Sequence, residues 1–188
     1  DMFYACYDSA SRGGDFEEIF QKIKNRYNDI ISGLGLDMSL EDDFEHIRLN
    51  FIGRAGRDYA ASRGEYLNGK IVAKLLGFAF IDAADVIFFD ESGKYDAKRT
   101  MPILRERLSY TEYAVIPGFY GSMPNDTIRT FSRGGSDITG SIVAAAADAD
   151  LYENWTDVSG FLIADPRVVD NPQVMKTVTY RELRELSY

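Results

Sequence analysis

The chain has 188 residues, of which 45% are hydrophobic and 27% charged, as in a globular protein with one substantial core. Its formal net charge of −9 argues against nucleic-acid binding, because phosphate contacts need clustered Lys and Arg. One cysteine, Cys6, excludes an internal disulfide, and one histidine, His46, excludes a His-cluster metal site. No apolar run could span a membrane and no signal peptide opens the chain, so we expect a cytoplasmic protein.

Helical spacing dominates the chain as far as Leu76. Asp15, with Glu18 three residues later, resembles a capping box at the start of the second predicted helix. The predicted helices cover residues 16–34, 39–53 and 58–76, after a first helix that contains Met2, Phe3, Cys6 and Tyr7. The chain begins inside one helix and stops at Tyr188 inside another, so we expect it to be a piece of a longer polypeptide.

Beyond Leu76, short apolar segments alternate with helices. Thr179 and Glu182 form a capping box for the last helix. The predicted strands cover residues 78–82, 86–89, 113–116, 127–131 and 151–156, and the helices between them cover 97–108 and 136–149. Such alternation predicts an α/β fold, a three-layer α/β/α sandwich with a mainly parallel sheet. We expect residues 1–188 to form a single compact domain, with ligands at the carboxyl ends of its strands.

A glycine turn opens the helix predicted at 136–149, in the segment Arg133-Gly134-Gly135-Ser136-Asp137. The glycines allow a ligand to approach the backbone, and the helix start presents free N–H groups to an anion. Arg133 suits bidentate binding of a carboxylate. The alternative is that Ser136 or Asp137 caps the helix and nothing binds. The residues of this segment alone leave both interpretations open.

A second segment runs from Thr156 to Arg167 and, taken alone, indicates a strand end and an ordinary loop. Together with the glycine turn it resembles the aspartate kinases of the amino-acid kinase family, in the pattern SRGGSD…WTDVSGFLIADPR. Two more motifs precede it in order. Residues 62–67 resemble that family's SxGExLS segment, with Asn68 where a serine is common, and residues 117–121 resemble its GF-x-G segment.

The resemblance implies ATP-dependent phosphorylation of the side-chain carboxylate of L-aspartate, the first step of aspartate-family amino-acid biosynthesis, which leads to lysine. Carried over by motif, Arg133 would bind the substrate α-carboxylate with help from Ser136. Glu65 would meet the α-ammonium group, and Phe119 would line the same pocket. Asp137 would be the catalytic residue, helping to organise the family's catalytic lysine.

For the nucleotide, the resemblance implies that Thr156 and Asp157 contact the adenosine and that Arg167 contacts the phosphates. Leu162 stands near the nucleotide where a tyrosine is usual. Mg²⁺ would be held mainly by the ATP phosphates, so we expect no metal ligands in the chain. Residues 1–125 would form the acceptor side and 126–188 the start of the nucleotide-binding side. The resemblance also implies a homodimer.

The sequence also departs from the family. The Lys-Phe-Gly-Gly-Thr-Ser segment that brings the catalytic lysine is absent, and Arg12-Gly13-Gly14-Asp15 contains no lysine to replace it. The regulatory ACT domains would lie beyond Tyr188. We therefore expect the isolated chain to be inactive.

Two other functions stay open. The chain could belong to another enzyme of the same fold, which phosphorylates glutamate, N-acetylglutamate or UMP. It could also be a non-catalytic domain that senses a ligand or regulates a partner subunit. Arg133 and Glu65 favour a zwitterionic amino acid, because together they supply a cation for the carboxylate and an anion for the ammonium group.

Overall fold

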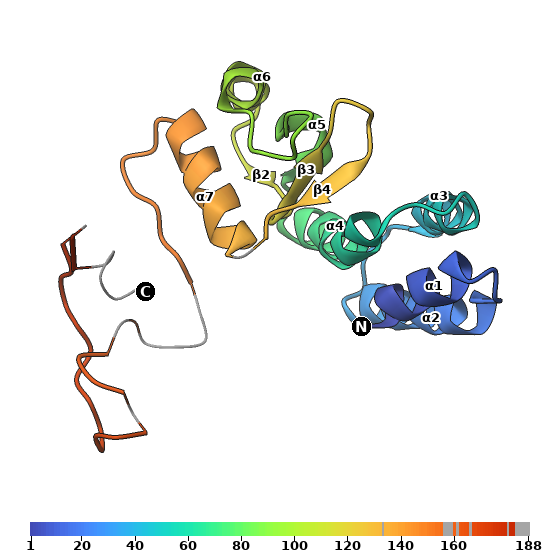
Figure 1. The fold of residues 1–188 in the computed structure, drawn as a ribbon, viewed down its shortest axis with the longest axis horizontal. Coiled ribbons are helices and arrows are strands. Elements are labelled where there is room, and N and C mark those ends of the chain that lie inside the picture. The colour runs from blue at the N-terminus through green and yellow to red at the C-terminus, as the bar shows by residue number, and fades with distance from the viewer. Residues whose placement is uncertain (133, 156–159, 161, 166, 180, 183–188) are drawn as a thin grey trace. The chain divides into compact units, whose positions relative to one another are not determined.

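The computed structural model describes residues 1–132, 134–155, 160, 162–165, 167–179 and 181–182. The chain divides into two compact units, Asp1–Tyr152 and Glu153–Tyr188. The first unit contains all the named helices and strands, and Figure 1 shows them in chain order. Each unit is described by itself.

Four helices form the amino-terminal part of the first unit: α1 (Met2–Ser11), α2 (Glu17–Gly33), α3 (Glu41–Ile52) and α4 (Arg57–Leu76). Their apolar faces enclose a core in which Phe20 packs edge-to-face on Phe44 and Phe51, with ring centroids 6.3 and 6.5 Å apart. Burial of such aromatic side chains is the main stabilising contribution here. The helices predicted from spacing are confirmed.

The capping box predicted at Asp15 and Glu18 is wrong. Helix α2 has Phe16 as its N-cap, which places Glu18 at the second helical position instead of the third. The Glu18 carboxylate therefore turns outward and accepts a hydrogen bond from Lys22 Nζ at 2.7 Å. Asp15 still contributes, because its Oδ1 accepts the Glu17 N–H at 2.8 Å.

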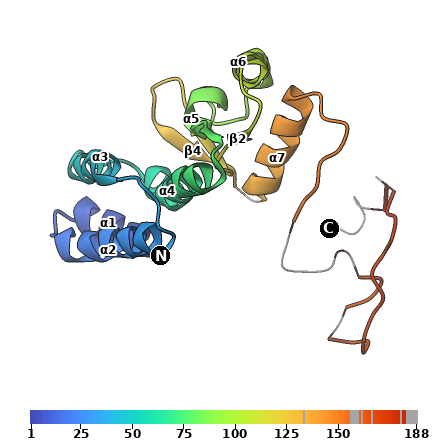
Figure 2. The same cartoon turned by 180° about the vertical axis from the view of Figure 1, so that it is seen from behind.

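Two short pairs of strands follow α4. Strand β1 (Ala79–Phe80) pairs in parallel with β2 (Ala114–Val115), and β3 (Tyr120–Ser122) pairs antiparallel with β4 (Ile128–Thr130). The helices among them are α5 (Ala83–Val86), α6 (Ala97–Ser109) and α7 (Gly135–Ala146). Both ribbon views place the strands between α4 on one side and α6 with α7 on the other (Figures 1 and 2).

A second core lies between these layers. Tyr120 is fully buried at its centre, and apolar side chains of α6 and α7 cover it, including Leu104 and Ile142. The Tyr120 hydroxyl donates to Asp82 Oδ1 at 2.7 Å, which satisfies its one polar group. The α/β fold with helices on both faces of the strands is thus confirmed, although the antiparallel β3–β4 pair accompanies the parallel one.

Two predicted strands are wrong. In the segment 86–89, Val86 is the last residue of helix α5, which Asp82 caps at its start by accepting the Ala84 N–H at 3.0 Å. Phe88 and Phe89 form only isolated bridges, with Ser122 and Tyr95 respectively. Residues 151–155 also form no strand. Leu151 is 72% exposed and Trp155 is 88% exposed, so the apolar pattern of this segment is not buried in a sheet. Thr156, the last residue of that prediction, lies outside the described residues.

The second unit carries one confirmed prediction. The Thr179 N–H donates to Glu182 Oε2 at 2.8 Å, and the Glu182 N–H donates back to Thr179 Oγ1 at 3.3 Å. These reciprocal bonds form the capping box expected at the last helix. Leu162 forms an antiparallel bridge with Val174 in the same unit.

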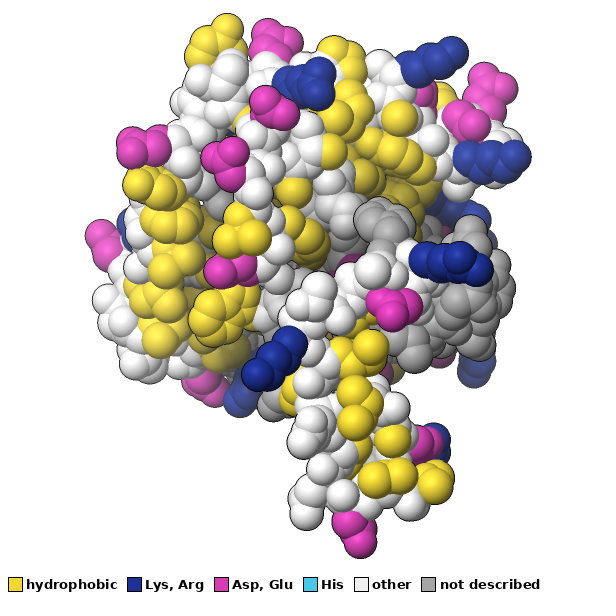
Figure 3. Space-filling view, turned by 90° about the vertical axis from the view of Figure 1, so that its left-hand side faces the viewer, with side chains coloured by type: hydrophobic (Ala, Val, Ile, Leu, Met, Phe, Trp, Pro, Cys, Tyr) yellow, Lys and Arg dark blue, Asp and Glu magenta, His cyan; other side chains and the backbone are white. Residues whose placement is uncertain are grey.

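Charged side chains are dispersed over the surface. On the face drawn in Figure 3, Lys and Arg side chains stand singly among Asp and Glu side chains. His46 is exposed on α3. None of the helices in the described ranges combines the length and the apolar run that crossing a bilayer requires.

Candidate functional site

The start of α7 and the segment around Phe119 pack against each other. Phe119 has a φ of +63°. Its N–H donates to Thr139 Oγ1 on α7 at 3.0 Å, and its carbonyl accepts the Phe131 N–H at 2.8 Å. Thr139 Oγ1 donates in turn to the Gly135 carbonyl at 2.9 Å. These bonds fix an unusual left-handed backbone conformation at a residue predicted to line the substrate pocket.

Glycines allow this close packing. A Cβ atom on Gly118 would lie 3.0 Å from Ser136 Cα, a distance that real Cβ atoms rarely reach. Gly135 abuts Phe119 in the same way. The close contact between the GF-x-G segment and the glycine turn therefore requires a glycine on each side, Gly118 and Gly135. The structure thus places the segment that carries Phe119 against the first turn of α7, which carries Ser136.

Helix α7 begins without a side-chain cap. Gly134 is its N-cap, in a left-handed conformation with φ +57°, and no side-chain hydrogen bond caps the helix. The N-cap residue is therefore neither Ser136 nor Asp137, which were the candidates in the alternative interpretation of this segment. Ser136 and Asp137 lie in the first turn of α7 and both are exposed. A helix start of this kind is favourable for an anion.

Glu65 lies on α4 and is exposed. One turn further along the same side of the helix, Gly69 faces Pro117, whose Cγ would lie 3.4 Å from a Cβ on that glycine. Helix α4 therefore meets the Pro117–Phe119 segment next to the turn that carries Glu65. On the neighbouring α2, burial raises the pKa of Tyr27 to about 12, and the Glu65 charge adds to the rise.

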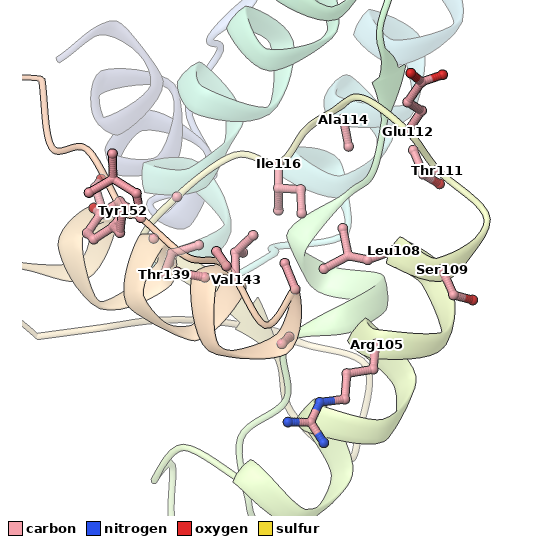
Figure 4. A pocket seen from close by; sticks show the side chains of 18 residues that line it. Arg105, Leu108, Ser109, Thr111, Glu112, Ala114, Ile116, Thr139, Val143 and Tyr152 are labelled. Atoms are coloured by element: carbon pink, nitrogen blue, oxygen red, sulfur yellow. The ribbon is translucent and has the colours of Figure 1, made fainter.

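A cavity of about 860 Å³ extends from this junction. Gly118, Ser136 and Thr139 form one end of its lining. Figure 4 shows Thr139 and Val143 of α7 facing Ile116 and Leu108 across it. The volume is typical of a small-molecule pocket. Its walls are largely apolar, so the polar groups at the Ser136 end would orient a ligand.

Asp137 lies on another side of α7 from Ser136. It lines a separate recess of about 480 Å³ together with Tyr95 and Met101. Consecutive helical residues point about 100° apart, which accounts for the separation. Among the described residues, no three His, Cys, Asp or Glu side chains gather in an arrangement that could hold a metal ion.

The other predicted residues lie in the second unit or outside the described residues. Arg133, Thr156 and Asp157 are outside them. Leu162 is half-buried. The exposed Arg167 guanidinium pairs with the Asp165 carboxylate at 2.7 Å, and this hydrogen bond lowers the pKa of Asp165.

Sequence reasoning missed Thr139. Its hydroxyl joins Phe119 to the first turn of α7, and its side chain is buried. A threonine four residues after the second glycine of the turn was the available signal, because a helical Thr hydroxyl can bond to the carbonyl of residue i−4.

Comparisons with known proteins agree with this arrangement. Residues 15–188 match the amino acid kinase family. The whole chain is 31% identical to aspartokinase 3 of Bacillus subtilis (strain 168) and covers 44% of that protein. A part comprising 45% of the chain is 42% identical to an aspartokinase of Mycolicibacterium smegmatis and covers 20% of that protein.

Among solved structures, the aspartate kinase of Clostridium acetobutylicum matches the whole chain with a TM-score of 0.93 and 53% identity, over 43% of that protein. E. coli aspartokinase III in complex with aspartate and ADP matches 93% of the chain with a TM-score of 0.72 and 24% identity, also over 43% of that protein. The second likeness concerns the fold alone. The chain thus spans less than half the length of each of these proteins.

Proposed function

Because the chain belongs to the amino acid kinase family, we propose that it forms part of an enzyme that transfers the γ-phosphoryl group of ATP to the side-chain carboxylate of L-aspartate. The observation that carries the proposal is the packing of Phe119 and Gly118 against Gly135 and Ser136. This packing joins the two motifs proposed for the acceptor site, which strands β3 and β4 separate in the chain. Likeness to proteins named aspartokinase over the whole chain supports the choice of acceptor.

The acceptor site would consist of Glu65, Phe119, Arg133 and Ser136. Arg133 would bind the α-carboxylate of aspartate, and Ser136, exposed at the uncapped start of α7, would add a hydroxyl donor. Glu65, exposed on α4, would pair with the α-ammonium group. Phe119 would close the apolar side. A cation and an anion held apart in this way select a zwitterion over a simple dicarboxylate.

Phosphoryl transfer places modest demands on these residues. The side-chain carboxylate of aspartate ionises near pH 4, so it is already a nucleophile at neutral pH and no strong base is required. Its oxygen forms the new P–O bond as the bond to the departing ADP oxygen breaks, which yields an acyl phosphate. The protein therefore contributes mainly by positioning two anions and offsetting their charge. Asp137, in the first turn of α7, would orient the family's lysine.

The nucleotide would contact Thr156, Asp157, Leu162 and Arg167. In the structure Arg167 pairs with Asp165 at the surface, and such an exposed pair contributes little to stability. Arg167 can therefore exchange this partner for a phosphate at little cost. ATP supplies the phosphoryl group. The ATP phosphates would hold Mg²⁺.

The assembly and location of the enzyme are also proposals. We place the acceptor side in residues 1–125 and the start of the nucleotide-binding side in 126–188, within one catalytic domain. A homodimer in the cytoplasm follows from the family resemblance. The reaction would open the synthesis of amino acids derived from aspartate, lysine among them.

ADP release by the full-length gene product tests the proposal. Mg-ATP is offered with aspartate, glutamate, N-acetylglutamate or UMP in parallel. We expect turnover with aspartate alone. Turnover with one of the other acceptors would retain the fold and overturn the substrate. Binding of ATP without turnover on any acceptor would favour a ligand-sensing or regulatory domain.

Substitution of Arg133 tests the acceptor site itself. Arg133→Ala should weaken aspartate binding by about 2–5 kcal/mol, as for the loss of a buried charge partner. Arg12→Ala is a matched control, because Arg12 also precedes two glycines but ends helix α1, away from the acceptor motifs. Unchanged aspartate affinity in Arg133→Ala would remove Arg133 from the site.

A further inference from the structure

Arg63 of α4 is a buried cation enclosed by tyrosine rings. Arg63 is only 6% exposed to solvent. The guanidinium lies 4.5 Å from the ring centroids of Tyr59 and Tyr66 and 5.5 Å from that of Tyr120. Its Nε and Nη2 donate to the hydroxyl of the adjacent Ser62 at 3.1 and 3.0 Å.

Arg63 has no carboxylate within ion-pair distance in the part of the chain that the structure describes. Burying an ion costs several kcal/mol, and cation–π contacts return only about 0.5–2 kcal/mol each. Asp82 lies in the same region, but its Oδ1 already accepts from the Tyr120 hydroxyl and from the Ala84 N–H. An anion from outside the chain would complete the site.

Arg63 lines a cavity of about 700 Å³, a volume suited to a small metabolite. Arg57 and Arg129 line it as well, and so do the carboxylates of Asp58, Asp82 and Asp126. His46, Tyr59, Asn50 and Thr127 complete the polar part of its lining. The cavity therefore offers cations, carboxylates and neutral donors to one ligand.

Asp58 and Arg129 of this cavity already have partners within the chain. Asp58 accepts the Thr130 N–H and hydroxyl at 3.2 and 3.1 Å and lies 3.5 Å from Arg129 Nη1. Arg57 lies 4.9 Å from the Tyr4 ring centroid and, like Arg63, belongs to no ion pair within the described ranges. An anionic group could therefore reach Arg63 and Arg57 without displacing an ion pair of the described ranges.

We propose that this cavity binds a small organic anion, whose carboxylate or phosphate group pairs with Arg63 and Arg57. The site is distinct from the acceptor site. Arg63 and Glu65 are two residues apart on α4, so they lie about 200° apart around the helix axis. The inference does not depend on the proposed kinase activity, because it rests on the charges and contacts of this cavity alone.

Calorimetric titration of the full-length gene product tests the inference. Inorganic phosphate and acetate are the probes, one for each type of anionic group. The titrations are made in an Arg133→Ala, Arg167→Ala background, which removes the arginines proposed to bind anions at the acceptor and nucleotide sites. We expect saturable binding of at least one probe. Arg63→Gln should weaken it about tenfold or more, the usual effect of losing a charge-assisted contact.

The matched control is Arg99→Gln. Arg99 also lies over an aromatic ring, 3.9 Å from the Phe88 centroid, but it does not line this cavity. It should leave probe binding unchanged. Arg57→Gln replaces an exposed residue and keeps the test valid if Arg63→Gln does not fold. The inference would be overturned if neither probe showed saturable binding. It would also be overturned if probe binding were undiminished in Arg57→Gln, or in Arg63→Gln that is shown to be folded.

Discussion

Gly135 lies directly against Phe119, and a Cβ atom built on Gly135 would be 2.6 Å from Phe119 Cβ and 2.9 Å from Phe119 Cα. The second of these atoms belongs to the backbone, so a larger residue could not be accommodated by a side-chain rotation. This contact sets the distance between the segment that carries Phe119 and the first turn of α7. The proposed acceptor site therefore depends on a glycine that need not touch the substrate.

Gly135→Ala should destabilise the protein and weaken aspartate binding. Overpacking at a tight contact costs about 1–3 kcal/mol, and here it would push Phe119 away from Ser136. Gly33→Ala is the control, because Gly33 lies in α2 with no atom within 4 Å of a built Cβ. Urea unfolding and the KM for aspartate measure both effects. Equal behaviour of the two variants would show that the contact is not restrictive.

The Thr139 hydroxyl should be needed to hold Phe119 in place. Thr139→Val keeps the shape of the side chain but leaves the Phe119 N–H without its acceptor, at a cost of about 1–3 kcal/mol. We expect a higher KM for aspartate, with the KM for ATP little changed. Thr139→Ser restores the hydroxyl and should recover most of the loss. If Ser and Val behave alike, the hydrogen bond does not position Phe119.

The Asp43 carboxylate should stabilise the junction of α3 and α4. It accepts from the Tyr66 hydroxyl at 2.7 Å and from Lys70 Nζ at 2.6 and 2.7 Å, and it is largely shielded from solvent. Asp43→Ala should lower the free energy of unfolding by about 1–3 kcal/mol.

The control for this substitution is Glu18→Ala, which removes the exposed pair with Lys22. Exposed pairs within one helix contribute little, so this variant should unfold at the same urea concentration as the wild type. An Asp43→Ala protein as stable as Glu18→Ala would show that the buried contacts make no net contribution.

Stability should fall in alkaline solution partly through Cys6. Burial, with the Glu17 charge adding to it, raises the pKa of the Cys6 thiol from 9.0 to about 11. The folded state therefore holds the thiol proton more tightly than the unfolded state does. This contribution is complete below about pH 9 and is lost as the pH rises toward 11.

Comparison of the wild type with Cys6→Ala isolates the thiol. Between pH 8 and pH 10 the free energy of unfolding of the wild type should fall by about 1 kcal/mol more than that of the variant. Tyr27 titrates at higher pH and is present in both proteins. Parallel pH profiles would contradict the assignment.

Local patterns in the sequence predicted the helices well. The apolar spacing of residues 16–34 and 58–76 gave the positions of α2 and α4 within a residue or so of the observed bounds. Strand β3 was not predicted, because Tyr120, Gly121 and Ser122 are all buried and so lack the alternation of a half-exposed strand. Helix α5 was not predicted, and its last residue, Val86, was assigned to a strand, because the Asp82 cap was not recognised.

The candidate site was predicted through its motifs and not through its geometry. The glycine turn and the GF-x-G segment could be found in the sequence, but their contact through Gly118 and Ser136 is a tertiary relationship that no local pattern encodes. The buried Arg63 was equally hidden, because arginine is usually exposed and its enclosure depends on Tyr120, far along the chain.

The central claim is that phosphate is transferred to the side-chain carboxylate of aspartate. The most direct test is to incubate the full-length protein with Mg-ATP and aspartate in the presence of hydroxylamine. Hydroxylamine converts an acyl phosphate to a hydroxamate and so traps the reaction product. We predict the side-chain hydroxamate of aspartate, in an amount equal to the ADP released. ADP release without any hydroxamate, or formation of the α-hydroxamate, would contradict the claim.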